Sequence, residues 1–218
     1  MKITRLVKAT ALVVALCVTP AHAGFIIFDS LNLQHEAGNL LDANTYAAQA
    51  FNSGTYTVLQ AVRLNVYYDE QEGAPGNFDV VLRAATGQDG RPGSVVATLA
   101  TGLPNPSSTD LNNIVSILGL NVSMSPNTTY YVAVQPNSGA FRWGYTSSEN
   151  GVGLPSGWSY SQDAGTTWTA PDQEDPQRMM IEAVPEPSTW MAGSVALIAL
   201  LSMAIQRRRE RCNPERSL

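Results

Sequence analysis

Short runs of β-branched and aromatic residues, separated by turn-forming residues, fill the middle of the chain. Val62, Leu64 and Val66 would share one face of a strand, with Arg63 and Asn65 on the other. Glycine- and proline-rich turns separate such runs at spacings of about ten residues, which is typical of sandwiches and jelly rolls. The pattern predicts a single all-β domain, β-sandwich or jelly-roll-like, of about eight to ten strands. The strand-like runs are 57–68, 78–84, 94–100, 113–124, 128–135, 141–147 and 178–184.

Helical periodicity is missing from the same region. No stretch within 25–184 keeps apolar residues at helical spacing for three turns. The segment 39–51 is the one place where we also consider a helical turn. We therefore expect helices only at the two ends of the chain, an N-terminal signal peptide helix and a C-terminal transmembrane helix.

The N-terminal segment 1–23 has the order of a cleavable signal peptide. Three basic residues precede the apolar stretch 9–18, and small residues close the segment. Lipidation at Cys17 is disfavoured because the bulky Leu16 precedes it. We therefore expect export and cleavage by signal peptidase after residue 23. The residues of this site are Ala21, Ala23 and Gly24.

A second hydrophobic run lies near the C-terminus. Residues 190–205 carry no charge and would form a helix of about 24 Å, a marginal membrane span. Trp190 would lie at one interface of the inner membrane, and an arginine cluster at 207–211 would hold the other end in the cytoplasm. Residues 212–218 would form a cytoplasmic tail. The basic residues of the cluster are Arg207, Arg208, Arg209 and Arg211.

Two prolines precede this run. Because Pro185 and Pro187 cannot continue a helix, the residues VPEPST should be extended just outside the membrane. An extended peptide at a fixed height above the bilayer suits the active site of a processing enzyme. An ordinary C-terminal anchor that is never processed is the alternative.

The segment VPEPSTWMAGSVALIALLSMAIQRRR resembles the PEP-CTERM sorting signal of Gram-negative bacteria. That signal combines a Pro-Glu-Pro triplet, a transmembrane stretch and an arginine cluster, as residues 185–211 do here. The resemblance implies that exosortase, a membrane transpeptidase-like enzyme, recognises Pro185, Glu186 and Pro187 and cleaves nearby. It also implies passage from the inner membrane, with a periplasmic domain, to the cell surface or exterior. The family is linked to exopolysaccharide and biofilm matrix, so a structural or adhesive role is expected.

The domain 24–184 has a resemblance of its own. The stretches AFNSGTYTVLQAVRL, GQDGRPGSVVATL and SPNTTYYVAV, followed by Trp143, look like a choice-of-anchor domain, most nearly of the R type. These β-rich surface modules of bacteria are joined to different sorting tails. The likeness implies no catalytic activity.

Composition narrows the partners of this domain. Between residues 24 and 184 there are 15 acidic residues, 5 arginines and no lysine, and so negative a surface would repel the phosphates of a nucleic acid. The two cysteines, Cys17 and Cys212, both lie outside the domain, so no disulfide is expected within it. The domain must be held together by its own hydrophobic core.

The residue types that catalysis needs are sparse. His35 is the only histidine of the exported domain, and no Gly-x-Ser-x-Gly elbow presents a serine. A zinc site lacks its usual histidines and cysteines. A carboxylate pair for glycoside hydrolysis stays open as an alternative. We predict that the protein is not an enzyme and uses no cofactor.

Aromatic residues make binding the better alternative. Trp143 and Tyr145 stand two residues apart, as do Trp158 and Tyr160, so each pair would face one way on a strand. Exposed, they would stack on sugar rings as a carbohydrate-binding module does. Facing inward, they would be ordinary sandwich core.

Two further sequence patterns are interpreted as local structure. The stretch SQDAGTTW, residues 161–168, resembles the Asp-box of sialidases, and we interpret it as a hairpin staple centred on Asp163. Acidic residues gather in two loops and raise Ca²⁺ as a weaker alternative to solvated turns, although neither loop follows the EF-hand order. These residues are Asp69, Glu70, Glu72, Asp79, Asp172, Glu174 and Asp175.

Overall fold

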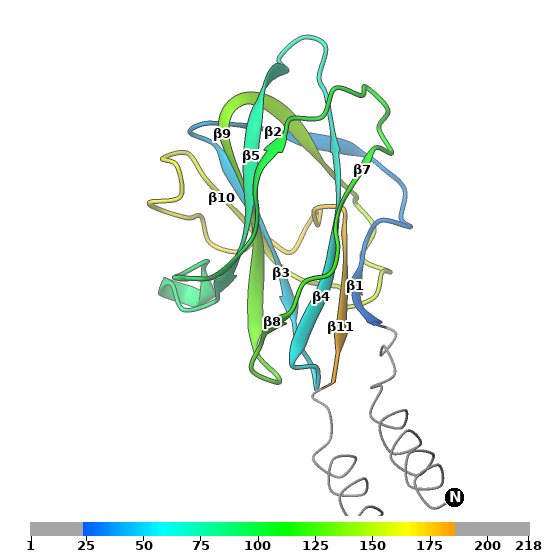
Figure 1. Cartoon of the computed structure of the whole chain (residues 1–218), viewed down its shortest axis with the longest axis vertical. Coiled ribbons are helices and arrows are strands. Elements are labelled where there is room, and N and C mark those ends of the chain that lie inside the picture. Colours follow the sequence, from blue (N-terminus) through cyan, green and yellow to red (C-terminus); the bar gives the residue numbers. More distant parts are fainter. Residues whose placement is uncertain (1–23, 186–218) are drawn as a thin grey trace, which may run out of the picture.

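A computed structural model describes residues 24–185 of the chain (Figure 1). The expected signal peptide, 1–23, lies outside these residues, as do the expected membrane span, 190–205, and its arginines. Within 24–185 the structure contains no helix with the length and hydrophobicity to cross a bilayer.

The described part of the chain is all-β, as expected. Eleven antiparallel strands form one continuous sheet, and a single 3₁₀ turn, η1 (Gln88–Gly90), interrupts the connection between β5 and β6. The strands are β1 (Phe25–Asp29), β2 (Ala37–Asp42), β3 (Tyr46–Asn52), β4 (Val58–Tyr67), β5 (Ala74–Ala84), β6 (Val95–Pro104), β7 (Ile114–Ile117), β8 (Val122–Ser123), β9 (Thr129–Tyr145), β10 (Trp158–Ser161) and β11 (Met179–Val184).

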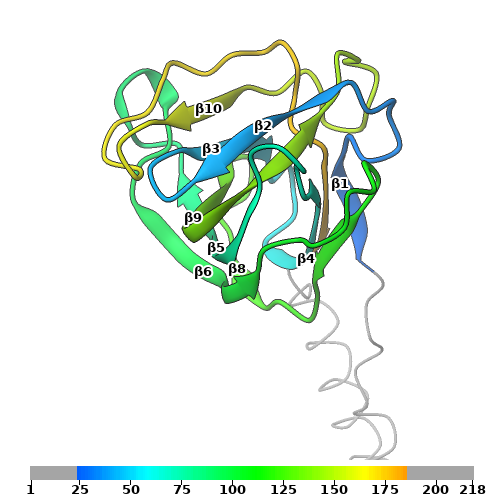
Figure 2. The ribbon, with the colours of Figure 1, turned by 90° about the horizontal axis from the view of Figure 1, so that it is seen from above.

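The sheet curls so that two parts of it enclose the core (Figure 2). In one part the order is β1, β11 and β4, with β7 and β8 paired to the other side of β4. In the other part the order is β10, β3, β9, β5 and β6. The end of β4 joins the two parts because Val66 and Tyr67 also pair with Trp143 and Arg142 of β9.

Alternating side chains build the core between these parts. Val62, Leu64 and Val66 of β4 are fully buried together, as their alternation predicted. Other strands contribute fully buried side chains to the same core: Phe78, Val80 and Leu82 of β5, Val132 and Val134 of β9, and Met179 and Ile181 of β11. Burying this many large apolar side chains stabilises the domain without disulfides.

Strand β9 is longer than the sequence indicated. The turn expected around residues 135–139 does not separate two strands; β9 continues through it with a bend. Gly139 takes a φ of 71°, and β5 starts so close to the bend that Asn77 N–H donates to Ser138 Oγ at 3.3 Å. The long bent strand therefore spans both parts of the sheet.

The helical turn considered for 39–51 is wrong. This segment forms β2 and β3, which pair one after the other with the second and first halves of β9. A tight turn separates them, in which Asp42 Oδ1 accepts the N–H groups of Asn44 at 2.8 Å and Thr45 at 2.7 Å. The pairing of β2 and β3 with the bent strand β9 outweighs the helical propensity of their alanines.

The first and last strands are neighbours. Phe25, the first residue of β1, lies opposite Ala183, the second-to-last residue of β11. Both ends of the described chain therefore leave the domain at the same pole, at the foot of the view in Figure 1.

Candidate functional site

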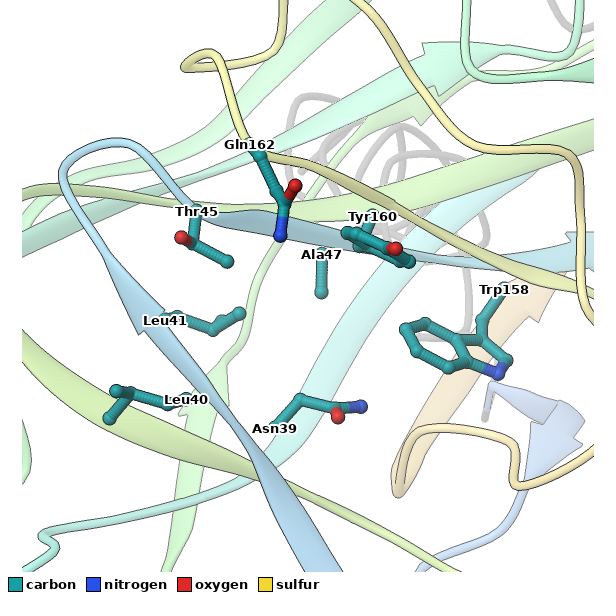
Figure 3. Close-up of a pocket in the computed structure, with 8 residues that line it drawn as sticks. All are labelled: Asn39, Leu40, Leu41, Thr45, Ala47, Trp158, Tyr160 and Gln162. Carbon is teal, nitrogen blue, oxygen red and sulfur yellow. The ribbon is translucent and has the colours of Figure 1, made fainter.

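A shallow groove lies where β10 runs beside the turn between β2 and β3 (Figure 3). In β10, Trp158 pairs with Gln49 of β3 and Tyr160 pairs with Ala47, so both aromatic side chains take the side of β3 that faces the core. β10 is the last strand on this side of the sheet. Its outer edge is bonded to the segment 169–172: Trp158 exchanges two backbone hydrogen bonds with Asp172, at 2.7 and 2.8 Å, and Thr169 N–H donates to the Tyr160 carbonyl at 2.9 Å. The groove has a volume of about 210 Å³ and is lined by Asn39, Leu40, Leu41, Thr45, Ala47, Trp158, Tyr160 and Gln162.

One hydrogen bond fixes the Trp158 ring, and another fixes the backbone at Tyr160. The Trp158 indole N–H donates to the carbonyl of Glu174 at 2.8 Å, and Tyr160 N–H donates to Thr169 Oγ1 at 3.1 Å. The ring centroids are 6.0 Å apart with the planes tilted by 32°. Tyr160 is 39% exposed and Trp158 is partly exposed. The pair therefore presents a pre-ordered aromatic surface to solvent.

A buried glutamine anchors the start of β10. The amide of Gln49 donates to the carbonyls of Ser156 at 3.1 Å and Gly157 at 3.2 Å, and Gln49 Oε1 accepts the N–H of Gln177 at 2.7 Å. Ala50 N–H adds a bond to Gly157 at 2.8 Å. These bonds hold the segment that leads into Trp158 against β3.

The polar side chains of the groove are neutral amides and a hydroxyl. Figure 3 shows the amide of Gln162 pointing into the hollow, with Asn39 on the opposite side. The side-chain nitrogen of Asn39 is shielded from solvent and has no hydrogen-bond partner among the described residues. Sequence patterns missed Asn39 and Thr45 because only the pairing of β2 and β3 brings them beside the two rings. Gln162 stands two residues after Tyr160, so the alternation that relates Trp158 to Tyr160 could have found it.

The other aromatic pair is not part of this surface. Trp143 is fully buried, and its indole N–H donates to the carbonyl of Arg178 at 3.1 Å, so it is core and does not fit glycan binding. Tyr145 is half-buried and pairs with Ala37 at the far end of β2. Of the four candidate aromatics, Trp143 is therefore core, Tyr145 is half-buried away from the groove, and Trp158 and Tyr160 line the groove.

The SQDAGTTW stretch is a hairpin staple, as interpreted from the sequence. Asp163 accepts the backbone N–H of Thr167 at 2.8 Å and the hydroxyls of Thr167 and Ser161 at 2.7 Å each. These bonds, led by the Thr167 N–H, lower the pKa of Asp163 to about 2. Gly165 takes a φ of 81°, the conformation that glycine allows in such a turn.

Trp168 of this hairpin covers the outer face of the sheet. It lies on a second small apolar cluster, which the strands β3, β5 and β9 provide. The Arg83 guanidinium lies 5.4 Å from the centroid of the Trp168 ring. The other members of this cluster are Ala48, Ala50, Val81, Tyr131 and Ala133.

Three carboxylates of the first acidic loop already contact other groups of the domain. Asp69 and Glu72 both form ion pairs with Arg142, and the Arg142 side chain is the main cause that lowers the pKa of Asp69 to about 2. Asp79 Oδ1 accepts Gly102 N–H at 2.7 Å and the Asn137 amide at 3.0 Å. Within 24–185 no three metal-binding side chains gather in one place.

A polar cluster lies under β2. Arg178 is buried and donates to Asn65 Oδ1 at 3.0 Å and to the carbonyl of Leu31 at 2.6 Å. His35 packs edge-on against Tyr67 with ring centroids 5.3 Å apart. Burial, and then the positive charge of Arg178, lower the pKa of His35. The face of β4 that carries Asn65 is therefore covered, although the sequence marks it as polar.

Two of the processing residues belong to the described chain. Gly24 directly precedes β1, and Pro185 is exposed directly after β11. Ala21, Ala23, Glu186, Pro187, Trp190 and the arginines 207–211 lie outside the described residues. Searches against models of known protein families and against curated protein sequences find no match to this chain, so the groove is argued from its own geometry.

Proposed function

We propose that the chain is an exported protein of the cell envelope or extracellular matrix, sorted by its C-terminal segment through recognition and cleavage by exosortase. Its domain is a sandwich or jelly-roll module of the choice-of-anchor kind, with a structural or adhesive role in an exopolysaccharide or biofilm matrix. It acts without catalysis and without a cofactor.

The limits of the folded domain support this proposal. β1 begins at Phe25, one residue after the signal-peptidase bond expected before Gly24. β11 ends at Val184, which is buried and pairs with Val58, and the Pro-Glu-Pro triplet starts at the next residue. Neither cleavage would remove a strand from the sheet, so both terminal segments are free to act as targeting signals.

The position of the two ends also suits a membrane-held precursor. Because Phe25 and Ala183 are paired, a signal peptide and a sorting tail would leave the domain at one pole. The rest of the domain would then extend into the periplasm. The acidic surface, with 15 carboxylates against 5 arginines in 24–184, suits an exported domain that stays soluble after release.

Carbohydrate binding is the second candidate function. The observation that favours it is the exposed, pre-ordered pair Trp158 and Tyr160 in a groove with neutral polar side chains. The Trp158 ring, whose N–H is already bonded to the Glu174 carbonyl, leaves its face for apolar contacts. An adhesive domain of a polysaccharide matrix would use such a surface.

Intact mass tests the sorting proposal. The full chain is expressed in cells with and without an exosortase, beside a variant with Pro185, Glu186 and Pro187 changed to alanine. The matched control changes Ser188 and Thr189 to alanine. We expect a product from Gly24 to near Pro187 only with exosortase and an intact triplet. A chain that runs to Leu218 in both strains overturns sorting and leaves a single-span anchored domain.

A further inference from the structure

We propose that the groove beside β10 binds the uncharged pyranose rings of a polysaccharide chain, with Trp158 and Tyr160 as the stacking surface. This inference rests on the second candidate function above and names its class of ligand.

The aromatic surface fits the apolar faces of sugar rings. Trp158 and Tyr160 are adjacent, with centroids 6.0 Å apart, and the 32° tilt between their planes makes a shallow cradle. The Trp158 indole N–H is already bonded to the Glu174 carbonyl, so binding would not leave it without a partner. Because this bond holds the Trp158 ring before any ligand arrives, little freedom of that side chain is lost on binding.

The polar side chains fit the edge of a sugar ring. Asn39, Thr45 and Gln162 lie around the rings and supply amide and hydroxyl groups. The side-chain nitrogen of Asn39 is shielded and has no partner within the described residues, which is costly for a buried donor. A turn of the Asn39 amide towards the groove would let a ligand hydroxyl satisfy this donor.

Charge determines which sugars fit. No residue that lines the groove is ionisable except Tyr160, and the domain as a whole is acidic. A uronate or sulfated sugar would need a cation, and every arginine described contacts another part of the chain. These arginines, none of which lines the groove, are Arg63, Arg83, Arg91, Arg142 and Arg178. The groove therefore favours neutral sugars.

The shape of the site favours a polymer over a single enclosed molecule. Its volume of about 210 Å³ is below the roughly 300–1,000 Å³ of sites that engulf a small molecule. A second hollow of about 180 Å³ adjoins it, and the two share Tyr160 and Gln162. A chain of linked sugars would pass over Tyr160 from one hollow to the other.

Calorimetric titration of the full chain in detergent tests this inference. The probes are three neutral hexasaccharides, cellohexaose, maltohexaose and mannohexaose, and an alginate oligomer as the acidic counterpart. We expect at least one neutral probe to bind and alginate not to bind. Tyr160→Ala should weaken binding about tenfold or more, whereas Tyr160→Phe, which keeps the ring, should stay within about threefold.

Controls separate the groove from general effects. Phe25→Ala removes another exposed aromatic, 53% exposed and far along the sheet in β1, and should leave binding unchanged. The binding result for Trp158→Ala is interpreted only if the thermal unfolding of this variant stays cooperative. Because Tyr160 is exposed, Tyr160→Ala should keep the fold and is the main test of the groove.

The outcomes distinguish the groove and its class of sugar from carbohydrate binding in general. Alginate binding that Tyr160→Ala abolishes overturns the neutral class but keeps carbohydrate binding. Neutral binding that survives both Tyr160→Ala and Trp158→Ala overturns the groove and keeps the function. Absence of binding to every probe overturns both, and leaves the sorting proposal unaffected.

Discussion

Trp143 of β9 donates its indole N–H to the carbonyl of Arg178, just before β11, across 3.1 Å of the closed core. The indole is fully buried, so Trp143→Ala removes both this bond and a large apolar volume. We expect a loss of about 3–5 kcal/mol in the free energy of unfolding, measured by urea denaturation. Trp158→Ala, at a partly exposed indole, is the control and should cost clearly less; equal losses would place both in the core.

The bend of β9 depends on a glycine. Gly139 has a φ of 71°, and a Cβ there would lie 2.3 Å from the Pro75 carbonyl oxygen and 2.4 Å from that of Ala74. Gly102 has a similar φ of 62° but open space around it. Gly102→Ala should therefore cost about 1–2 kcal/mol from backbone strain alone.

Gly139→Ala should cost a further ~1–3 kcal/mol, because its methyl group also collides with backbone. Thermal unfolding of the two variants side by side measures the difference. If both variants unfold at the same temperature, β9 is free to bend elsewhere and the contact with β5 does not fix its path.

Asp163 gives the hairpin a dependence on acid. Its folded pKa of about 2 lies below the usual 3.8 of an aspartate, because it accepts bonds from Thr167 and Ser161. A depressed folded pKa contributes stability that is present above about pH 4 and lost as the pH falls towards 2. Asp163→Asn should therefore flatten the stability profile between pH 4 and 2, as followed by thermal unfolding. A profile parallel to that of the parent chain would refute the staple.

His35 is a base and Asp163 an acid, but the contribution of each to stability falls as the pH falls. Its pKa is lowered from 6.5, first by burial and then by Arg178, so the unfolded chain binds the proton more readily. Stability from neutral His35 is therefore full above about pH 6.5 and declines as the pH falls below it. Glu36 opposes this shift, and Tyr67 packs against the ring.

Nuclear magnetic resonance measures this pKa directly, because a chain that starts at Gly24 contains no other histidine. We expect a midpoint below 6.5 in the folded chain. Arg178→Gln should raise the midpoint, since it removes the nearby positive charge, whereas a midpoint at or above 6.5 in the parent chain would contradict the burial of the imidazole.

Strands with clear alternation were predictable from the sequence. Val62, Leu64 and Val66 alternate because one face of β4 packs on the core, and that alternation is visible in the residues. β2 and β3 were not predictable, because their partner is a bent strand far along the chain and their alanines carry no strand signal. β10 is only four residues long and depends on Gln49 for its position.

The candidate site likewise has residues that the sequence predicted and residues that it did not. Spacing alone placed Trp158 and Tyr160 on one side of a strand, and the pairing of β10 with β3 agrees. The same spacing applied to Trp143 and Tyr145, yet Trp143 is in the core, because exposure is a property of what lies opposite a strand. Asn39 and Thr45 could not be linked to the rings before the β2–β3 turn was known.

The pairing of Phe25 with Ala183 also determines how the domain would respond to mechanical force. A pull on the two ends in opposite directions would open β1 from β11 one hydrogen bond at a time, as a zipper opens. A load between Pro185 and a polymer held at Tyr160 would instead be shared across β11, β4, β9 and β3 before it reached β10. A matrix domain tethered only by its C-terminal end would thus keep the β1–β11 pairing out of the path of tension.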